Sequence, residues 1–348
     1  MRRPREFVAS NAKVAHVRRW MVIALAGFVF LQLGTGVVPR LARASAAAPA
    51  PEKPQAGWTV GVRSARGVVS DYKMEYVAGV WFRVFRLRAR SALLRWHVGA
   101  LDPPGAWGAV PADAGPAIDW SSEGLAGVVG VFNGGFKVGA HAGGSMVDGR
   151  VLSPLVPGDM TIALDAAGHW RLGVWGQTLP SASFHPIALR QNLLPLVLGG
   201  RLTSAAHANI LTWGSPLNNQ PEEPRSGLGV DAAGNLVYVA TMSNIGPVQL
   251  GEALVGAGVR SGMELDMNPY WPILGGSFRA LHSPGPLPVQ IPYSEHNPDI
   301  YFNGWQRDFF VGLAEPNSWA CSWVSPGLTP GRMSAQPLHL VGAGCARS

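Results

Sequence analysis

The chain has 348 residues, of which 47% are hydrophobic and 14% are charged, with 44 glycines and 29 prolines. This composition excludes a disordered chain, allows a large core and favours a β-rich fold with many turns. The net charge of +7 lies in the leader, because residues 1–44 hold eight of the 28 basic and one of the 21 acidic residues. The remainder carries 20 of each sign, so we expect no nucleic-acid partner.

The N-terminus is predicted to take the protein to or through a membrane. A basic leader, residues 1–19, precedes an uncharged apolar run, residues 20–38, which is about long enough to span a bilayer as a helix. The run is either a transmembrane anchor with its N-terminus inside or a signal segment cleaved near Ala44. In both cases an Ala/Pro linker, residues 39–56, leads to a domain outside the cytoplasm, which is membrane-anchored or secreted.

The folded domain, residues 57–313, is predicted to be α+β, with a β-rich mixed sheet, hairpins and a few packed helices. Its elements are read from hydrophobic periodicity and turn residues. In chain order they are one long strand or a hairpin over 79–98, a strand over 128–132, a hairpin over 161–175, a second hairpin over 227–241, a helix that begins near Pro247, and a strand that stops at Asp266.

The C-terminal tail, residues 314–348, contains the two cysteines of the chain, Cys321 and Cys345. In an exported protein a single pair of this kind is typical of a disulfide. We expect the bond to fasten a tail that is otherwise rich in Pro, Gly and Ser.

The strand over 128–132 ends on Asn133-Gly134-Gly135, which is an unusual way to leave a buried strand. Glycine costs backbone entropy, so it is favoured where φ is positive or where another group approaches the backbone closely. One interpretation is a plain glycine-rich connection. The other is that a ligand meets the backbone at this strand end.

The order of these motifs resembles the phosphodiester glycosidase family, whose best-known member removes N-acetylglucosamine from a phosphodiester to uncover mannose 6-phosphate. The matching motifs are "FNGGF" at 132–136, Arg225-Ser226 at the opening of a strand, and "ELD" at 264–266, with "WQRDFFV" at 305–311 similar to the family's closing strand. Lys137 replaces the second Phe of the first motif, and "MNPYW" replaces the Gly-Gly-Gly-Ser that follows the Asp in the third.

The resemblance implies an exported hydrolase that cleaves sugar-1-phosphate linkages in envelope glycopolymers. Its catalytic candidates are Asp266 and Glu264, which we expect on one face because they are two apart on a strand. Asp266 would be an acid–base group or a ligand of a divalent metal ion; no cofactor is certain. Asp148 is a third carboxylate, in a "VDGR" segment more typical of a turn.

The expected partner is a sugar phosphate or another anionic glycan, with the membrane contacted through the N-terminal segment. Arg225 would clamp the phosphate by a bidentate fork. The remaining substrate-binding candidates are Asn133, Gly134, Gly135 and Asn268. The alternative is a non-catalytic envelope protein that keeps the fold and binds glycans.

Overall fold

The computed structural model describes residues 57–103, 115–118, 127–140, 142–216, 220–276, 289–290 and 294–314. The predicted leader, apolar run and linker lie outside these ranges, as does the expected disulfide between Cys321 and Cys345.

The β-rich part of the expected fold class is confirmed, but the transmembrane or signal segment placed before it is not supported. None of the helices within the described ranges is long and apolar enough to cross a bilayer. Over the described residues the fold class is therefore corrected to a β-rich architecture with few helices, and residues 20–38 lie outside these ranges. Location outside the cytoplasm stays a prediction.

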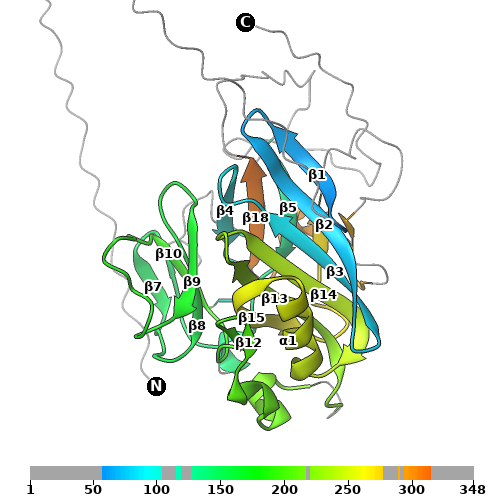
Figure 1. Cartoon of the computed structure of the whole chain (residues 1–348). Helices are drawn as coiled ribbons and strands as arrows, with labels where there is room; N and C mark the ends of the chain where they lie inside the picture. The colour runs from blue at the N-terminus through cyan, green and yellow to red at the C-terminus, as the bar shows by residue number, and fades with distance from the viewer. Residues whose placement is uncertain are drawn as a thin grey trace, which may run out of the picture. The chain divides into compact units, whose positions relative to one another are not determined.

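The described residues form three antiparallel sheets (Figure 1). The largest has eight strands in the order β1-β2-β3-β14-β13-β15-β11-β12. Their bounds are β1 Thr59–Ser64, β2 Gly67–Val77, β3 Val80–Leu87, β14 Leu236–Ile245, β13 Glu223–Asp231, β15 Val259–Met267, β11 Val197–Leu198 and β12 Arg201–Leu202.

The other two sheets have five strands each. One runs β17-β16-β5-β18-β4, with bounds β17 Val289–Gln290, β16 Leu274–Gly276, β5 Val128–Asn133, β18 Phe309–Ala314 and β4 Ala92–His97. The other runs β7-β6-β10-β8-β9, with bounds β7 Arg150–Ser153, β6 Ser145–Val147, β10 Ala188–Gln191, β8 Met160–Leu164 and β9 Trp170–Val174.

The helices of the described residues are short. The α-helices are α1 Pro247–Gly256 and α2 Ile300–Asn303, and the 3-10 helices are η2 Val138–Ala140, η3 Ser204–His207 and η4 Ile210–Trp213. Helix α1 begins with Pro247 in its first turn, where a missing N–H costs nothing, and this start is the one predicted. Its buried face contacts β13, β14 and β15.

Both predicted hairpins are confirmed as β8–β9 and β13–β14. In each turn an Asp side chain accepts backbone N–H bonds: Asp165 from Ala167 and His169, and Asp231 from Ala233 and Asn235. The prediction for residues 79–98 is wrong, because β3 and β4 belong to different sheets. A backbone turn closed by Ala92 N and Arg88 O separates the two strands.

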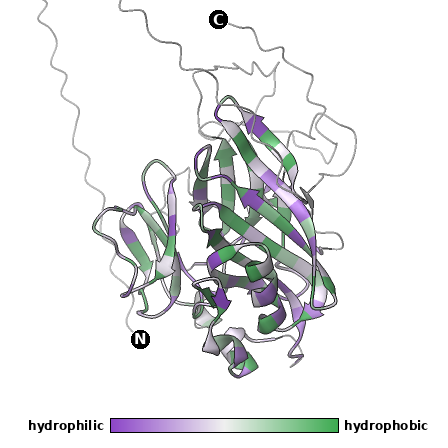
Figure 2. Cartoon of the chain, in the orientation of Figure 1, coloured by the Kyte–Doolittle hydropathy of each residue, from purple (hydrophilic) through white to green (hydrophobic). Residues whose placement is uncertain are grey.

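The main core is shared by all three sheets. Side chains such as Phe85, Phe132, Phe310, Met160 and Leu265 are 0–1% exposed and belong to one cluster. A second cluster lies under α1 and includes Trp213, Val239 and Leu254. Figure 2 shows the strands of the interior mostly in the hydrophobic colour, whereas β1 and β2 are mixed.

The ends of β5 and β15 meet although the strands belong to different sheets. Asp266 N donates to Gly134 O at 3.4 Å, and Gly134 N donates to Asp308 O at 2.9 Å. Strand β18, which follows Asp308, pairs with β5 so that Phe309 lies opposite Asn133. This junction brings the predicted motifs at 132–136, 264–266 and 305–311 together.

Candidate functional site

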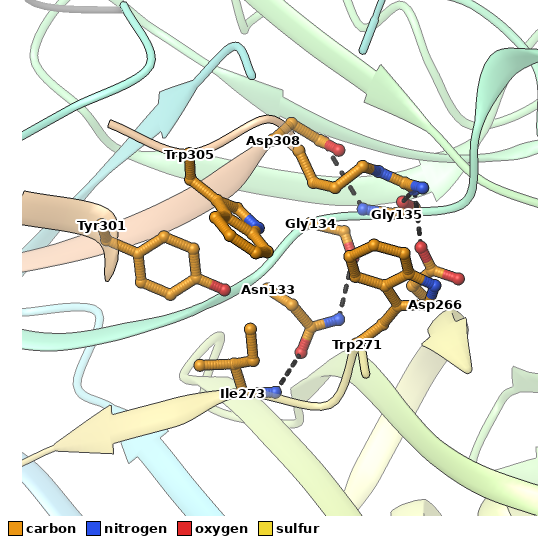
Figure 3. Close-up of a pocket in the computed structure, with 10 residues that line it drawn as sticks. Asn133, Gly134, Gly135, Asp266, Trp271, Ile273, Tyr301, Trp305 and Asp308 are labelled. Carbon is orange, nitrogen blue, oxygen red and sulfur yellow. Dashed lines mark hydrogen bonds and ion pairs between the residues drawn. The ribbon is translucent and has the colours of Figure 1, made fainter. Parts of the chain in front are cut away.

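A small cavity lies at this junction and is shown in Figure 3. It is enclosed by the end of β5, the end of β15, the segment after β15, helix α2 and the residues before β18. Its lining residues are Asn133, Gly134, Gly135, Asp266, Trp271, Ile273, Tyr301, Trp305, Arg307 and Asp308. Its volume of about 10 Å³ is close to that of one water-sized sphere.

Asp266 is one of two carboxylates that line this cavity, the other being Asp308, and it is 6% exposed. One oxygen accepts from Arg307 Nη2 at 2.6 Å, and the other accepts from Met267 N at 2.9 Å. Burial raises the pKa of the Asp266 carboxyl to about 6, against the opposing effect of the Arg307 guanidinium. Both protonation states are therefore accessible near neutral pH.

Arg307 joins the carboxylate to the strand end of β5. Its Nη2 donates to Gly135 O at 2.9 Å as well as to Asp266. Its Nε lies 3.6 Å from Asp102 Oδ2, and its guanidinium carbon lies 4.8 Å from the ring centre of Trp271. These contacts fix a cation in one orientation at the wall of the cavity.

A larger groove of about 550 Å³ adjoins this wall and shares Trp271 and Arg307 with the cavity. Its other lining residues are Leu101, Asp102, Lys137, Gly139, Ala140, Ser215 and Gln306. Lys137 is exposed there, at the position where the family motif has Phe. The groove has the volume of a small-molecule site and carries two cationic residues.

Aromatic side chains gather beside the cavity. The ring centres of Trp271 and Trp305 lie 6.4 Å apart in a T-shaped arrangement, and those of His296 and Trp305 lie 4.8 Å apart, also T-shaped. Tyr270 completes the group and is 46% exposed. Such rings offer flat amphipathic surface, which suits contact with sugar rings.

Asn133 lines the cavity, but its side chain is occupied by the protein itself. Its amide nitrogen donates to Ser226 Oγ and Gly134 O, both at 3.0 Å. Its amide oxygen accepts from Tyr238 Oη at 2.7 Å and from Ile273 N at 3.2 Å. The four bonds hold β5, β13 and β14 together, so the amide acts here as a structural connector.

Gly134 and Gly135 lack a Cβ, and this lets two side chains pack directly against the backbone. A Cβ on Gly134 would overlap the carboxylate of Asp308, and a Cβ on Gly135 would overlap the amide of Asn192. Asp308 is in turn held by Arg190 Nε at 2.8 Å and Trp96 Nε1 at 2.9 Å. In this packing the protein's own groups meet the backbone of the Asn-Gly-Gly motif, and a ligand at this strand end stays a prediction.

Arg225 and Glu264 lie away from the cavity and pair with each other, both side chains being fully buried. Arg225 also donates to the backbone carbonyls of Ile245, Trp213 and Pro221. Burial raises the pKa of Glu264 to about 7, opposed by the Arg225 guanidinium. A phosphate clamp by Arg225 is not supported by this geometry, because no face of the guanidinium is open.

The expectation that Glu264 and Asp266 share a face is wrong. The pairing register between β13 and β15 shifts between the pairs Arg225–Met267 and Gly227–Glu264. This irregularity interrupts the two-residue alternation, so the carboxylates turn to different arginines. Glu264 lines neither the cavity nor the groove, so the catalytic role predicted for it is not supported by this geometry.

Two further candidates have turn geometry. Asn268 has φ +81° and its side chain accepts from Tyr270 N, while Asp148 has φ +48° at the exposed turn between β6 and β7. Neither lines the cavity or the groove. Across the described part of the chain, no three His, Cys, Asp or Glu side chains are grouped so that they could hold a metal ion.

Sequence reasoning missed Arg307, Asp308 and Tyr301 as site residues. Arg307 and Asp308 stand in the "WQRDFFV" segment, which resembles the family's closing strand. A polar Gln-Arg-Asp step just before the apolar Phe-Phe-Val run was the available signal. No sequence signal points to Tyr301, because its position depends on packing against Phe309. The centres of the two rings lie 4.3 Å apart.

No protein-family model matches the chain, and no curated protein matches it. Among solved structures, the catalytic domain of zebrafish N-acetylglucosamine-1-phosphodiester alpha-N-acetylglucosaminidase, auto-inhibited by its pro-peptide, is 12% identical with a TM-score of 0.45. That match covers 74% of this chain and 88% of the other. A hypothetical protein from Synechocystis is 12% identical with a TM-score of 0.42, over 70% of this chain and 62% of the other, which is less than two thirds of that protein. Both are distant likenesses of fold and carry no argument about activity, so family membership stays a prediction.

Proposed function

We propose that the protein is a hydrolase of sugar phosphodiesters in which Asp266 is the acid–base group. The observation that carries this proposal is the position of Asp266. It is a buried carboxyl with a pKa of about 6, held by Arg307 at the wall that the cavity and the groove share. A group whose pKa lies near the working pH transfers protons efficiently.

The groove supports an anionic sugar as the ligand. Arg307 and Lys137 supply positive charge, which suits a phosphodiester. Trp271, which lines the groove, supplies an aromatic surface against which a sugar ring packs. We propose envelope glycopolymers outside the cytoplasm as the source of that ligand, on the basis of the basic leader and apolar run that precede a body of zero net charge.

The test is release of free sugar from a synthetic sugar-1-phosphodiester by the full chain. The matched pair of variants is Asp266→Asn and Asp148→Asn, since Asp148 is an exposed turn carboxylate that lines neither the cavity nor the groove. We expect Asp266→Asn to lose about 10²–10⁴-fold in turnover, the usual range for acid–base assistance, while Asp148→Asn keeps wild-type turnover. Equal turnover in wild type and Asp266→Asn would refute the role of Asp266.

The second candidate function is glycan binding without cleavage. It is favoured by the small volume of the cavity, about 10 Å³, which leaves the groove as the place for a sugar and Asp266 behind its wall. In this case an anionic glycan binds to wild type and to Asp266→Asn with similar affinity, and no sugar is released by either.

A further inference from the structure

Tyr301 carries a buried hydroxyl that the site described so far does not use. The residue is 0% exposed, and its Oη has no hydrogen-bond partner among the described residues. Figure 3 shows the hydroxyl end of the ring directed into the cavity. Burial raises the pKa of Tyr301 well above its ordinary value, so the phenol keeps its proton and can donate.

Tyr238 offers a direct contrast at the same site. It is 1% exposed, and its Oη donates to Asn133 Oδ1 at 2.7 Å and approaches Ile273 O at 3.3 Å. Two buried phenols therefore lie near Asn133. The Tyr238 hydroxyl is hydrogen-bonded to the protein, whereas the Tyr301 hydroxyl is not. Buried polar groups that lack a protein partner are usually satisfied by ordered water.

Two carboxylates line the cavity, Asp266 and Asp308, and Asp266 has more acceptor capacity left. Asp308 Oδ2 already accepts from Arg190, Trp96 and Gly135, and Asp308 Oδ1 accepts from Arg190 Nη2 at 3.3 Å. The amide of Asn133 is saturated by its four bonds, whereas each Asp266 oxygen accepts one bond and retains a second lone pair. A volume of about 10 Å³ has room for a single water.

We propose that this cavity is a binding site for one water molecule, which accepts a hydrogen bond from Tyr301 Oη and donates one to the Asp266 carboxylate. The site contains two partners of opposite role, which is what a bound water needs in order to be oriented. Tyr301 is thus a positioning residue that acts on Asp266 through the water.

The catalytic consequence rests on the proposed function. Asp266, oriented by the cavity water, takes a proton from a second water in the groove as the oxygen of that second water bonds to the anomeric carbon. The bond from that carbon to the phosphate oxygen breaks, and its electron pair leaves with the phosphomonoester. Atoms and charge balance without a metal or a redox partner, because water supplies both the hydroxyl and the proton.

The deciding experiment is a crystal structure of the full chain at a resolution that shows ordered water, for wild type and Tyr301→Phe. We expect a peak within hydrogen-bonding distance of both oxygens in wild type and its loss in the variant. A wild-type cavity without that peak, or a peak unchanged in Tyr301→Phe, overturns the proposal.

Stability gives an independent readout with Tyr238→Phe as the matched control. Removing the Tyr238 hydroxyl breaks a made bond, so we expect the folding equilibrium constant to fall about fivefold or more. Tyr301→Phe should leave that constant unchanged or lower, because a hydrated hydroxyl is lost. A rise of about fivefold or more would mean that the hydroxyl was unsatisfied, which contradicts the water site.

Turnover separates the two proposals. If wild type cleaves the phosphodiester, we expect Tyr301→Phe to lower kcat about tenfold or more with KM nearly unchanged, because the groove is untouched. Wild-type kcat in that variant would remove the catalytic role. If wild type releases no sugar, the hydrolase proposal fails, and the crystallographic peak still decides the water site.

Discussion

Strand β15 presents two carboxylates two residues apart, and each meets an arginine in a different way. Glu264 and Arg225 form a closed pair with both side chains fully buried, and the remaining guanidinium bonds go to backbone carbonyls. Asp266 and Arg307 form an open pair, which lines a cavity and borders a groove. An Arg–carboxylate pair in a sequence therefore does not by itself mark a site, because what separates the two pairs is access.

The largest effect we expect comes from breaking the closed pair. Arg225→Met leaves the Glu264 carboxylate buried without its partner, and such a change typically costs about 3–5 kcal/mol in unfolding free energy. Chemical denaturation measures the loss. The double variant Arg225→Met with Glu264→Leu should recover part of it, since no charge is then left uncompensated.

The opposite result for Arg225 would contradict the distinction between the closed pair and the open pair. If Arg225→Met folded with nearly wild-type stability and instead lost affinity for anionic glycans, the phosphate-clamp hypothesis would return. An exposed arginine, Arg150, provides the control, since Arg150→Met should change neither property.

The pH dependence of stability should sharpen the same comparison. The folded-state pKa of Glu264 is raised from 4.5 to about 7, so the folded state binds the extra proton between these values. The unfolding free energy contributed by Glu264 therefore falls as pH rises from about 4.5 to about 7 and is level on either side. Against Glu264→Gln, wild type should lose stability of the order of 1–3 kcal/mol across this window.

Denaturation at pH 4, 5.5 and 7 for wild type and Glu264→Gln measures that difference. A constant difference over the range would show that the pKa of Glu264 is the same in the folded and unfolded states, which contradicts the raised value. Asp266 carries a similar contribution between 3.8 and about 6, which both proteins share and which cancels.

A smaller effect is expected at the open pair. Trp271→Ala removes the ring that faces Arg307 at 4.8 Å and lines both cavity and groove, so we expect affinity for an anionic glycan to fall about tenfold. Isothermal titration checks this. Trp81, a 58% exposed tryptophan on β3 outside the groove, is the control, and equal losses in Trp271→Ala and Trp81→Ala would contradict a specific role.

Local patterns predicted the elements that build the junction. The strand end at Asn133, the Asp-Ala-Ala-Gly turns and the start of α1 at Pro247 all follow from residues close together in the chain. The contact between Asp266 and Arg307, which are 41 residues apart, could not be predicted from local patterns, because it depends on how two sheets pack. The register shift beside Glu264 leaves no mark in the alternation of apolar residues, so the sequence alone predicts that the two carboxylates share one face.

The packing around Gly134 and Gly135 has a consequence for recognising other proteins of this kind. Because the missing side chains make room for Asp308 and Asn192, natural variation at these positions is restricted by volume, whatever the protein binds. A sequence search based on Asn-Gly-Gly alone would return proteins that need the same space for packed side chains, including proteins with unrelated substrates. A search that also required an Arg-Asp step before the closing strand and a Leu-Asp strand end would instead select for the open pair.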